Sequence, residues 1–115
     1  MLRFDVFERL GLSVAAMSDI ADGDCGRRSL DQAAAVEARQ AVSQRLNLEA
    51  DDLVCANQVH GIEVAVAREI DKGRGIIDVS PAFPETDGIL TNTKGVPIAI
   101  FVADCVPVYL FDPVT

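Results

Sequence analysis

One helical pattern followed by a succession of strand-sized apolar segments most constrains what this chain can fold into. The helix is predicted to begin at Ser29, which can cap its N-terminus while Gln32 reaches back toward it, and Asn47 is expected to end it. Asp31 in the first turn suits the positive end of the helix dipole. The predicted apolar stripe of the helix consists of Ala34, Ala38, Ala41, Val42 and Leu46.

Short segments rich in apolar and β-branched residues predict the strands. They are Leu12–Met17 before the helix and, after it, Leu53–Asn57, Ile62–Ala67, Ile76–Val79, Ile89–Thr91, Ile98–Val102 and Val108–Phe111. The unbroken apolar run Ile98–Val102 is typical of a strand buried on both faces. One helix followed by mainly strands favours an α+β fold with a mixed β-sheet over alternating βαβ units.

The charge balance narrows the classes of partner. The chain of 115 residues has 18 Asp and Glu against 10 Lys and Arg, a formal net charge of −8. Such a surface repels phosphate backbones and anionic lipid headgroups, which argues against nucleic acid and membrane surfaces as partners. Because no apolar run reaches bilayer length and the N-terminus lacks a signal-peptide pattern, we expect a cytoplasmic protein.

Three cysteines, Cys25, Cys55 and Cys105, are widely spaced and form no CxxC pair. An odd number of such cysteines favours free thiols in a reducing compartment over a disulfide framework. Cys55 lies in the middle of a predicted strand and is interpreted as a core residue. Cys25, in a polar loop, is either a reactive surface thiol or a residue without a chemical role.

The candidates for chemistry are His60 and Cys105. His60, the only histidine, lies between two predicted strands and precedes Gly61, which lets the backbone turn and leaves the ring accessible. Cys105 follows Asp104 at the predicted end of a strand, because Pro107 interrupts pairing just beyond it. A neutral imidazole and a thiolate are suitable ligands for zinc or copper, and Asp104 can orient a ligand or carry a proton.

A simpler interpretation stands beside each candidate. One histidine and one cysteine at this separation do not form a metal motif, and free cysteines commonly fill cores. Asp87-Gly88 is interpreted as a turn leading into the next strand, since turns favour this dipeptide. The alternative for Asp87 is a carboxylate placed near the His60 and Cys105 site.

Three segments in register are more specific than any of these residues alone. They are Cys55–Gly61 with its Gln-Val-His-Gly sequence, Thr86–Thr91, and Val102–Val108 with its Ala-Asp-Cys sequence. Together they resemble the laccase-domain family, also called the multicopper polyphenol oxidoreductase family, whose members include purine nucleoside phosphorylases and a peptidoglycan editing factor. The resemblance is best over residues 53–112, and residues 1–115 are interpreted as a single partial domain of this type.

The resemblance implies half of an α/β/β/α sandwich with a mixed β-sheet, in a cytoplasmic enzyme. It implies zinc-dependent phosphorolysis of adenosine or inosine and deamination of adenosine, with a purine nucleoside and phosphate as substrates. An older assignment for the family is copper-dependent oxidation of phenols. Carried over by position, the metal ligands are His60 and Cys105, and the residues assigned a catalytic role are Cys105 and Asp104.

The chain departs from the family in one important respect. The family's third metal ligand is a histidine in a His-Ala-Gly-Trp-Arg-Gly segment after the cysteine, whereas this sequence has one histidine and no tryptophan. We therefore expect a truncated enzyme whose third ligand is missing, with little or no activity alone. It is expected to need a further C-terminal half or a second copy, as a homo-oligomer.

Two other functions stay open. The first is a non-catalytic, self-associating domain, because a cut sandwich exposes apolar faces and strand edges. The second, ranked lower, is a copper-dependent polyphenol oxidoreductase, because a single histidine and a single thiolate do not form the arrangement of several copper ions that such chemistry uses.

Overall fold

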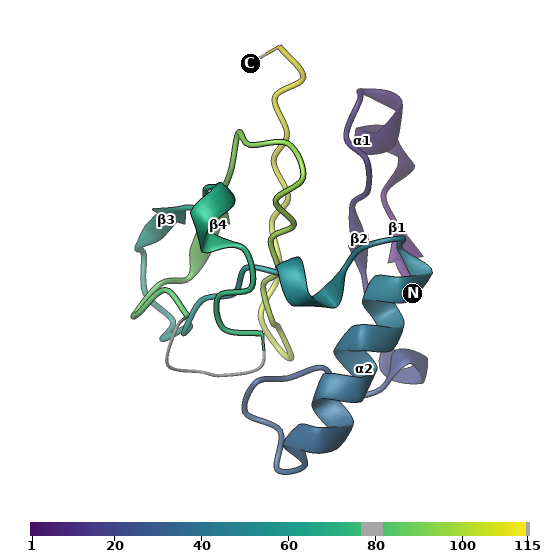
Figure 1. The fold of residues 1–115 in the computed structure, drawn as a ribbon, viewed down its shortest axis with the longest axis vertical. Coiled ribbons are helices and arrows are strands. Elements are labelled where there is room, and N and C mark those ends of the chain that lie inside the picture. The colour runs from purple at the N-terminus through teal and green to yellow at the C-terminus, as the bar shows by residue number, and fades with distance from the viewer. Residues whose placement is uncertain (77–81, 115) are drawn as a thin grey trace.

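The computed structural model describes residues 1–76 and 82–114 (Figure 1). Two small sheets and one long helix form the fold, which confirms the predicted α+β class. The elements in chain order are β1 (Leu2–Arg3), α1 (Asp5–Arg9), β2 (Ala16–Met17), a 3-10 turn (Ile20–Asp22), α2 (Gln32–Arg45), a 3-10 turn (Ala50–Asp52), β3 (Val64–Val66), a 3-10 turn (Glu69–Asp71) and β4 (Gly88–Leu90). β1 pairs with β2 antiparallel, whereas β3 pairs with β4 in parallel.

Helix α2 is the predicted helix, with a corrected start. Its N-cap is Asp31, not Ser29, because the Asp31 carboxylate accepts the backbone N–H of Ala34 at 3.0 Å. Gln32 does reach back, but its side-chain amide donates to the backbone carbonyl of Ser29 at 2.6 Å. Asn47 has a left-handed φ of 57° just beyond the last turn, which confirms that it ends the helix.

The buried face of α2 differs from the predicted stripe. Its buried residues are Ala35, Arg39 and Ser43, while Ala34 and Ala41 are exposed. The two small side chains let neighbouring backbone approach the helix closely, and the Arg39 guanidinium donates to backbone carbonyls that would otherwise lack partners. Apolar periodicity alone cannot locate a face that is organised around an arginine.

The core forms around the segment that follows the helix. Alternate residues of Leu53–Ala56 face two small clusters, as expected for extended backbone. Leu53 and Cys55 pack with Ile76, Ala99 and Phe101, whereas Val54 packs with Ala67, Val96, Phe83 and Ile89. The predicted strand Leu53–Asn57 appears only as two isolated parallel bridges, from Val54 to Ile98 and from Ala56 to Phe83.

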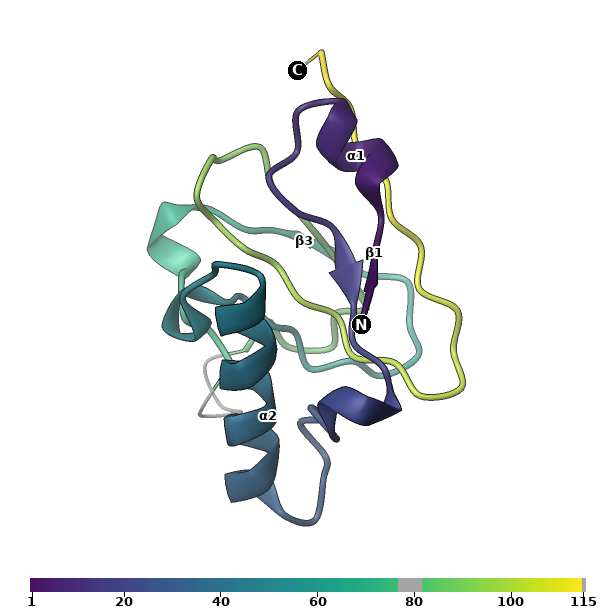
Figure 2. The same cartoon turned by 90° about the vertical axis from the view of Figure 1, so that its right-hand side faces the viewer.

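The predicted strands Ile98–Val102 and Val108–Phe111 are wrong for this structure. Only Ile98 makes a bridge. Ile98, Ile100 and Val102 are 40%, 38% and 37% exposed instead of buried on both faces, and Val108 and Leu110 are 78% and 91% exposed. The physical reason is that no strand among the described residues flanks this segment on its other side. Figures 1 and 2 show residues 98–114 as an arm without strands that turns at the bend of residues 103–105 and then runs back along the molecule to end near α1.

Aromatic contacts hold the end of this arm. The Tyr109 ring lies 4.8 Å from that of Phe4, and the Phe111 ring lies 6.4 Å from that of Phe7 in an edge-on arrangement. The Tyr109 hydroxyl donates to the Ala16 carbonyl at 2.9 Å. These contacts attach the arm to the β1–α1–β2 unit without ladder pairing.

The remaining strand predictions are met in part. Leu12–Met17 contracts to β2, and Ile62–Ala67 contracts to β3. The prediction Ile89–Thr91 is confirmed by β4, and of Ile76–Val79 residues 77–79 lie outside the described part of the chain. Within residues 1–76 and 82–114, no helix has both the length and the apolar character needed to cross a bilayer.

Candidate functional site

His60 occupies a sharp backbone turn between the core segment and β3. Its φ is 62°, in the left-handed region that residues other than glycine rarely adopt. The residue is exposed, as is Gly61 after it. The turn therefore presents the imidazole to solvent, as the sequence predicted, but it does so with strain in His60 itself.

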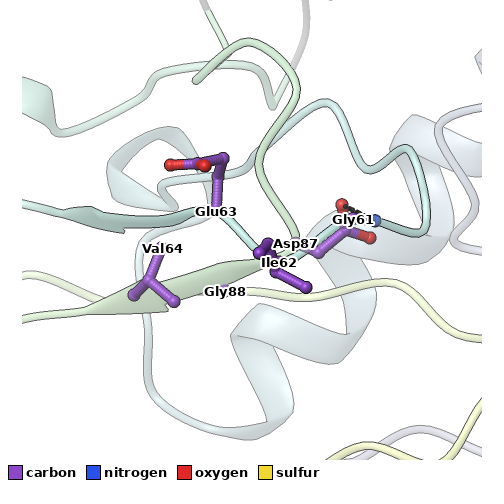
Figure 3. A pocket seen from close by; sticks show the side chains of 6 residues that line it. All are labelled: Gly61, Ile62, Glu63, Val64, Asp87 and Gly88. Carbon is purple, nitrogen blue, oxygen red and sulfur yellow. Dashed lines mark hydrogen bonds between the residues drawn. The ribbon is translucent and has the colours of Figure 1, made fainter.

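Asp87 stabilises this turn from the neighbouring loop. Its Oδ1 accepts the backbone N–H groups of Val59 at 3.0 Å and Gly61 at 2.9 Å, and its Oδ2 accepts that of His60 at 2.9 Å. These N–H groups, those of Val59 and Gly61 foremost, hold the pKa of the Asp87 carboxyl below its usual value. Three consecutive backbone donors thus converge on one carboxylate directly before β4, and Figure 3 shows that carboxylate next to Gly61.

A small hollow lies where this turn meets the parallel strands. It has a volume of about 160 Å³ and is lined by Gly61, Ile62, Glu63, Val64, Asp87 and Gly88 (Figure 3). The backbone carbonyl of Glu63 accepts the N–H groups of Asp87 and Gly88 at 3.0 and 3.2 Å. Because small-molecule sites typically enclose about 300–1,000 Å³, we interpret the hollow as part of the anchor for the turn.

Gln58 connects the His60 turn to the arm that carries Cys105. Its side-chain Nε2 donates to the Phe101 carbonyl at 2.7 Å, and its Oε1 accepts the Phe101 N–H at 2.9 Å. On the other side, Arg28 donates to the Gln58 carbonyl at 2.7 Å. The backbone just before His60 is therefore fixed to the backbone that leads into Asp104 and Cys105.

Asp104 and Cys105 lie in a bend of the arm, and both side chains are exposed. The broad open hollow that they line together with His60 also borders most other parts of the chain, so it does not by itself bring these side chains together. An imidazole and a thiol are donors that zinc accepts, so they fit part of a metal site. Among the described residues, however, no group of three or more His, Cys, Asp or Glu side chains is placed to hold a metal ion.

The other two cysteines, Cys55 and Cys25, are less exposed than Cys105. Cys55 is fully buried, which confirms its interpretation as a core residue, and burial raises the pKa of its thiol to about 11. Cys25 is half-buried, and burial also raises the pKa of its thiol. All three cysteines, Cys105 included, are free thiols.

Asp87 is the residue whose role the sequence interpretation understated. The turn was preferred for Asp87-Gly88, yet the carboxylate binds the very loop that carries His60. The signal lay in the combination of an acid just before a strand and a histidine-glycine turn that must adopt a left-handed backbone. Neither segment alone indicates that the two meet in space.

Comparison with known proteins places the chain in a family. The sequence model described as multi-copper polyphenol oxidoreductase laccase matches residues 6–115. A purine nucleoside phosphorylase, YlmD of Geobacillus stearothermophilus, is 35% identical over 83 residues, which are 72% of this chain and 30% of that protein. An adenosine deaminase, RL5 of an unknown prokaryotic organism, is 34% identical over 90 residues, which are 78% of this chain and 32% of that protein.

The likeness extends to three dimensions. The crystal structure of the Geobacillus YlmD superposes on 71% of this chain and 31% of its own length, with a TM-score of 0.69 and 31% sequence identity. This chain accordingly spans about a third of the length of the curated relatives that it matches. From the matching sequence model, the identities and the shared fold, the chain belongs to the laccase-domain, or multi-copper polyphenol oxidoreductase, family.

Proposed function

We propose that this chain carries the histidine and cysteine ligands of a zinc site in an enzyme that acts on purine nucleosides. The observation that carries the proposal is that two hydrogen bonds between Gln58 and Phe101 join the segment of His60 to the segment that leads into Cys105. The relatives' names support the substrate class, since several are purine nucleoside phosphorylases and one is an adenosine deaminase. The family is metal-dependent by its description, and zinc is our choice of metal.

In this proposal His60 contributes an imidazole nitrogen and Cys105 a thiolate, while the third ligand comes from outside these two segments. Zinc, when bound, supplies a Lewis acid to the reaction. Phosphorolysis breaks the bond between ribose C1′ and the purine and forms a bond from C1′ to a phosphate oxygen. The departing base needs a proton, and we assign to the exposed Asp104 carboxyl, beside Cys105 in the chain, the role of carrying one or of orienting a ligand.

The partners of the proposed site are a purine nucleoside and phosphate. Because catalytic zinc sites use three protein ligands and keep one position open, the two ligands of this chain make an incomplete site. We therefore propose little or no activity for this chain alone, and full activity when a further segment or a second copy completes the site. The acidic surface and three free thiols support a cytoplasmic location.

A chimera tests this function directly. In the Geobacillus relative, the matching third of the chain is replaced by the present sequence, and the product is assayed for adenine or hypoxanthine release from adenosine or inosine with phosphate. We expect a zinc-containing, active chimera. His60→Ala and Cys105→Ala should each remove both zinc and activity from a protein that still folds, and a folded chimera that keeps both despite these changes contradicts the proposal.

Exposed apolar side chains favour one second candidate, a self-associating domain. Val106, Val108, Leu110 and Val114 are each at least 78% exposed along the unpaired arm, and such a row of side chains beside a free strand edge promotes association. A second copy of this chain is the occupant we consider. Sedimentation analysis distinguishes the candidates, because a stable dimer that binds no zinc supports self-association alone. The copper-dependent oxidation of phenols rests on the family description only and is ranked last.

A further inference from the structure

We propose that Asp87 is a positioning residue for the metal site, acting on the backbone of His60 and not on its ring. This inference rests on the proposed function, because it takes His60 as a metal ligand. Its basis is the set of three hydrogen bonds, each between 2.9 and 3.0 Å, from Val59, His60 and Gly61 to one carboxylate. Asp87 touches neither the imidazole's metal-facing atoms nor a substrate in this role.

The turn needs such a partner for two physical reasons. A left-handed backbone at a residue with a Cβ is sterically unfavourable, so the turn at His60 needs contacts that hold its shape. In addition, the turn directs three successive N–H donors to one side, where a single carboxylate can accept all three. A carboxylate meets both needs, because hydrogen bonds to a charged acceptor are stronger than those between neutral groups.

Asp87 is itself fixed by the parallel sheet. Its own backbone N–H donates to the Glu63 carbonyl at 3.0 Å, directly before β3 and β4 pair from Val64 to Gly88. The next residue, Gly88, packs so tightly that a Cβ there would lie 3.1 Å from a methyl group of Val64. The Asp87 carboxylate therefore links the backbone of His60 to the paired strands β3 and β4.

The test uses cobalt(II) as the probe, because a cobalt–thiolate absorption band reports coordination by Cys105. Titrations are made in a Cys25→Ser background, with Cys55 buried, for wild type, Asp87→Asn and Asp87→Ala. The matched control is Asp71→Asn, since Asp71 also binds loop backbone, accepting the Arg68 N–H at 2.9 Å, but does so away from His60. Backbone amide exchange by NMR is measured on the same proteins without metal.

We expect cobalt affinity to fall about 10- to 100-fold in Asp87→Ala, as for loss of other groups that orient metal ligands, and less in Asp87→Asn, which keeps one acceptor oxygen. The amides of Val59, His60 and Gly61 should lose exchange protection in the same order. Asp71→Asn should lower thermal stability and leave both readouts unchanged. The comparison of the Asp87 variants with Asp71→Asn therefore separates positioning of His60 as a metal ligand from a general loss of stability.

Two outcomes overturn the inference while sparing the proposed function. One is a folded Asp87→Ala protein that binds cobalt as tightly as wild type, and the other is an equal loss of affinity in Asp71→Asn. If the wild-type chain takes up no cobalt at all, the proposed metal function fails instead. The amide exchange of Val59, His60 and Gly61 then decides on Asp87, because unchanged protection in Asp87→Asn and Asp87→Ala rejects it as the residue that holds the turn.

Discussion

Gln58 and Phe101 are joined by a two-point hydrogen bond in which the side-chain amide of one pairs with the backbone of the other. Nε2 of Gln58 donates to the Phe101 carbonyl at 2.7 Å, and the Phe101 N–H donates to Oε1 at 2.9 Å. The side-chain amide of Gln58 thus pairs with the Phe101 backbone as a backbone amide does in a β-sheet. It fixes the spacing between the His60 turn and the arm that carries Cys105.

Replacement of Gln58 by methionine should weaken metal binding as well as folding. Methionine keeps the length of the side chain but removes both hydrogen bonds, so about 1–3 kcal/mol of stability is expected to be lost. Cobalt affinity should fall because the two ligand-bearing segments are no longer joined. Gln32→Met is the matched control, since Gln32 also bonds to backbone carbonyls but outside the site. Equal cobalt affinities for the two variants would contradict this role of Gln58.

Arg39 should be the arginine whose loss costs most stability. It is 4% exposed and donates to the carbonyls of Cys25 at 2.6 Å and Ile76 at 2.7 Å, with its guanidinium 5.4 Å from the centre of the Phe101 ring. Arg39→Met leaves both buried carbonyls without these donors and is expected to cost about 2–5 kcal/mol in urea unfolding.

The control for that change lies on the same helix. The side chain of Arg45 is 60% exposed, and it pairs with Asp22, whose side chain is 1% exposed. Because the Asp22 carboxylate keeps the Asp19 N–H and the N-terminal ammonium group as partners, Arg45→Met should cost less stability than Arg39→Met. Similar losses in the two variants would show that Arg39 does not organise the buried face of α2.

Gly75 should resist substitution for reasons of space as well as backbone conformation. Its φ is 81°, and a Cβ at this position would lie 2.6 Å from the Cβ of Ala82 and 3.3 Å from that of Cys55. We expect Gly75→Ala to cost about 2–4 kcal/mol, the sum of left-handed strain and overpacking. Gly11→Ala isolates the strain, because Gly11 has a φ of 111° and no atom within 4 Å of the added carbon. Chemical denaturation of both variants measures the difference, and a smaller loss at Gly75 than at Gly11 is incompatible with the tight packing described.

The sequence predicted local features of the fold well and long-range pairing poorly. The helix, its end at Asn47 and the strand at Ile89 follow from capping, backbone preference and β-branched composition, which act within a few residues. The predicted strand Val108–Phe111 is wrong because a buried strand needs neighbours on both sides, and an apolar run in the sequence does not show whether such neighbours are present.

The candidate site shows the same division. His60 and Cys105 are predicted by residue type and by the family resemblance, and the hydrogen bonds between Gln58 and Phe101 join the segments that carry them. The contacts that organise them were not found, because Asp87 meets His60 across 27 positions and Gln58 meets Phe101 across 43. Such contacts depend on how the parallel strands and the arm pack, which no local pattern encodes.

Stability should decline at alkaline pH because of Cys55. Its thiol has a pKa near 9.0 when unfolded and about 11 in the fold, where burial disfavours the thiolate. The stabilising effect of keeping the neutral thiol is present in full below pH 9 and is lost as pH rises through about 11, because the unfolded chain releases its proton first. The free energy of unfolding lost in this way amounts to about 3 kcal/mol at most.

Urea unfolding measured between pH 8 and pH 11 tests this. Wild type should lose more stability over that range than Cys55→Ala, which has no group to titrate at this position. Thiol labelling below pH 9 should likewise be slow at Cys55 and fast at the exposed Cys105. If stability falls with pH equally in wild type and Cys55→Ala, Cys55 is not the cause of the loss at alkaline pH.

The native mass of the purified chain with a small excess of zinc tests the central claim most directly, because it reports bound metal and subunit number together. We predict that wild type retains zinc, as a single chain or as an oligomer that completes the ligand set. His60→Ala and Cys105→Ala should each appear without zinc in otherwise folded protein. A wild-type chain free of zinc, or zinc retained in both variants, would show that His60 and Cys105 are not the ligands of a shared metal site.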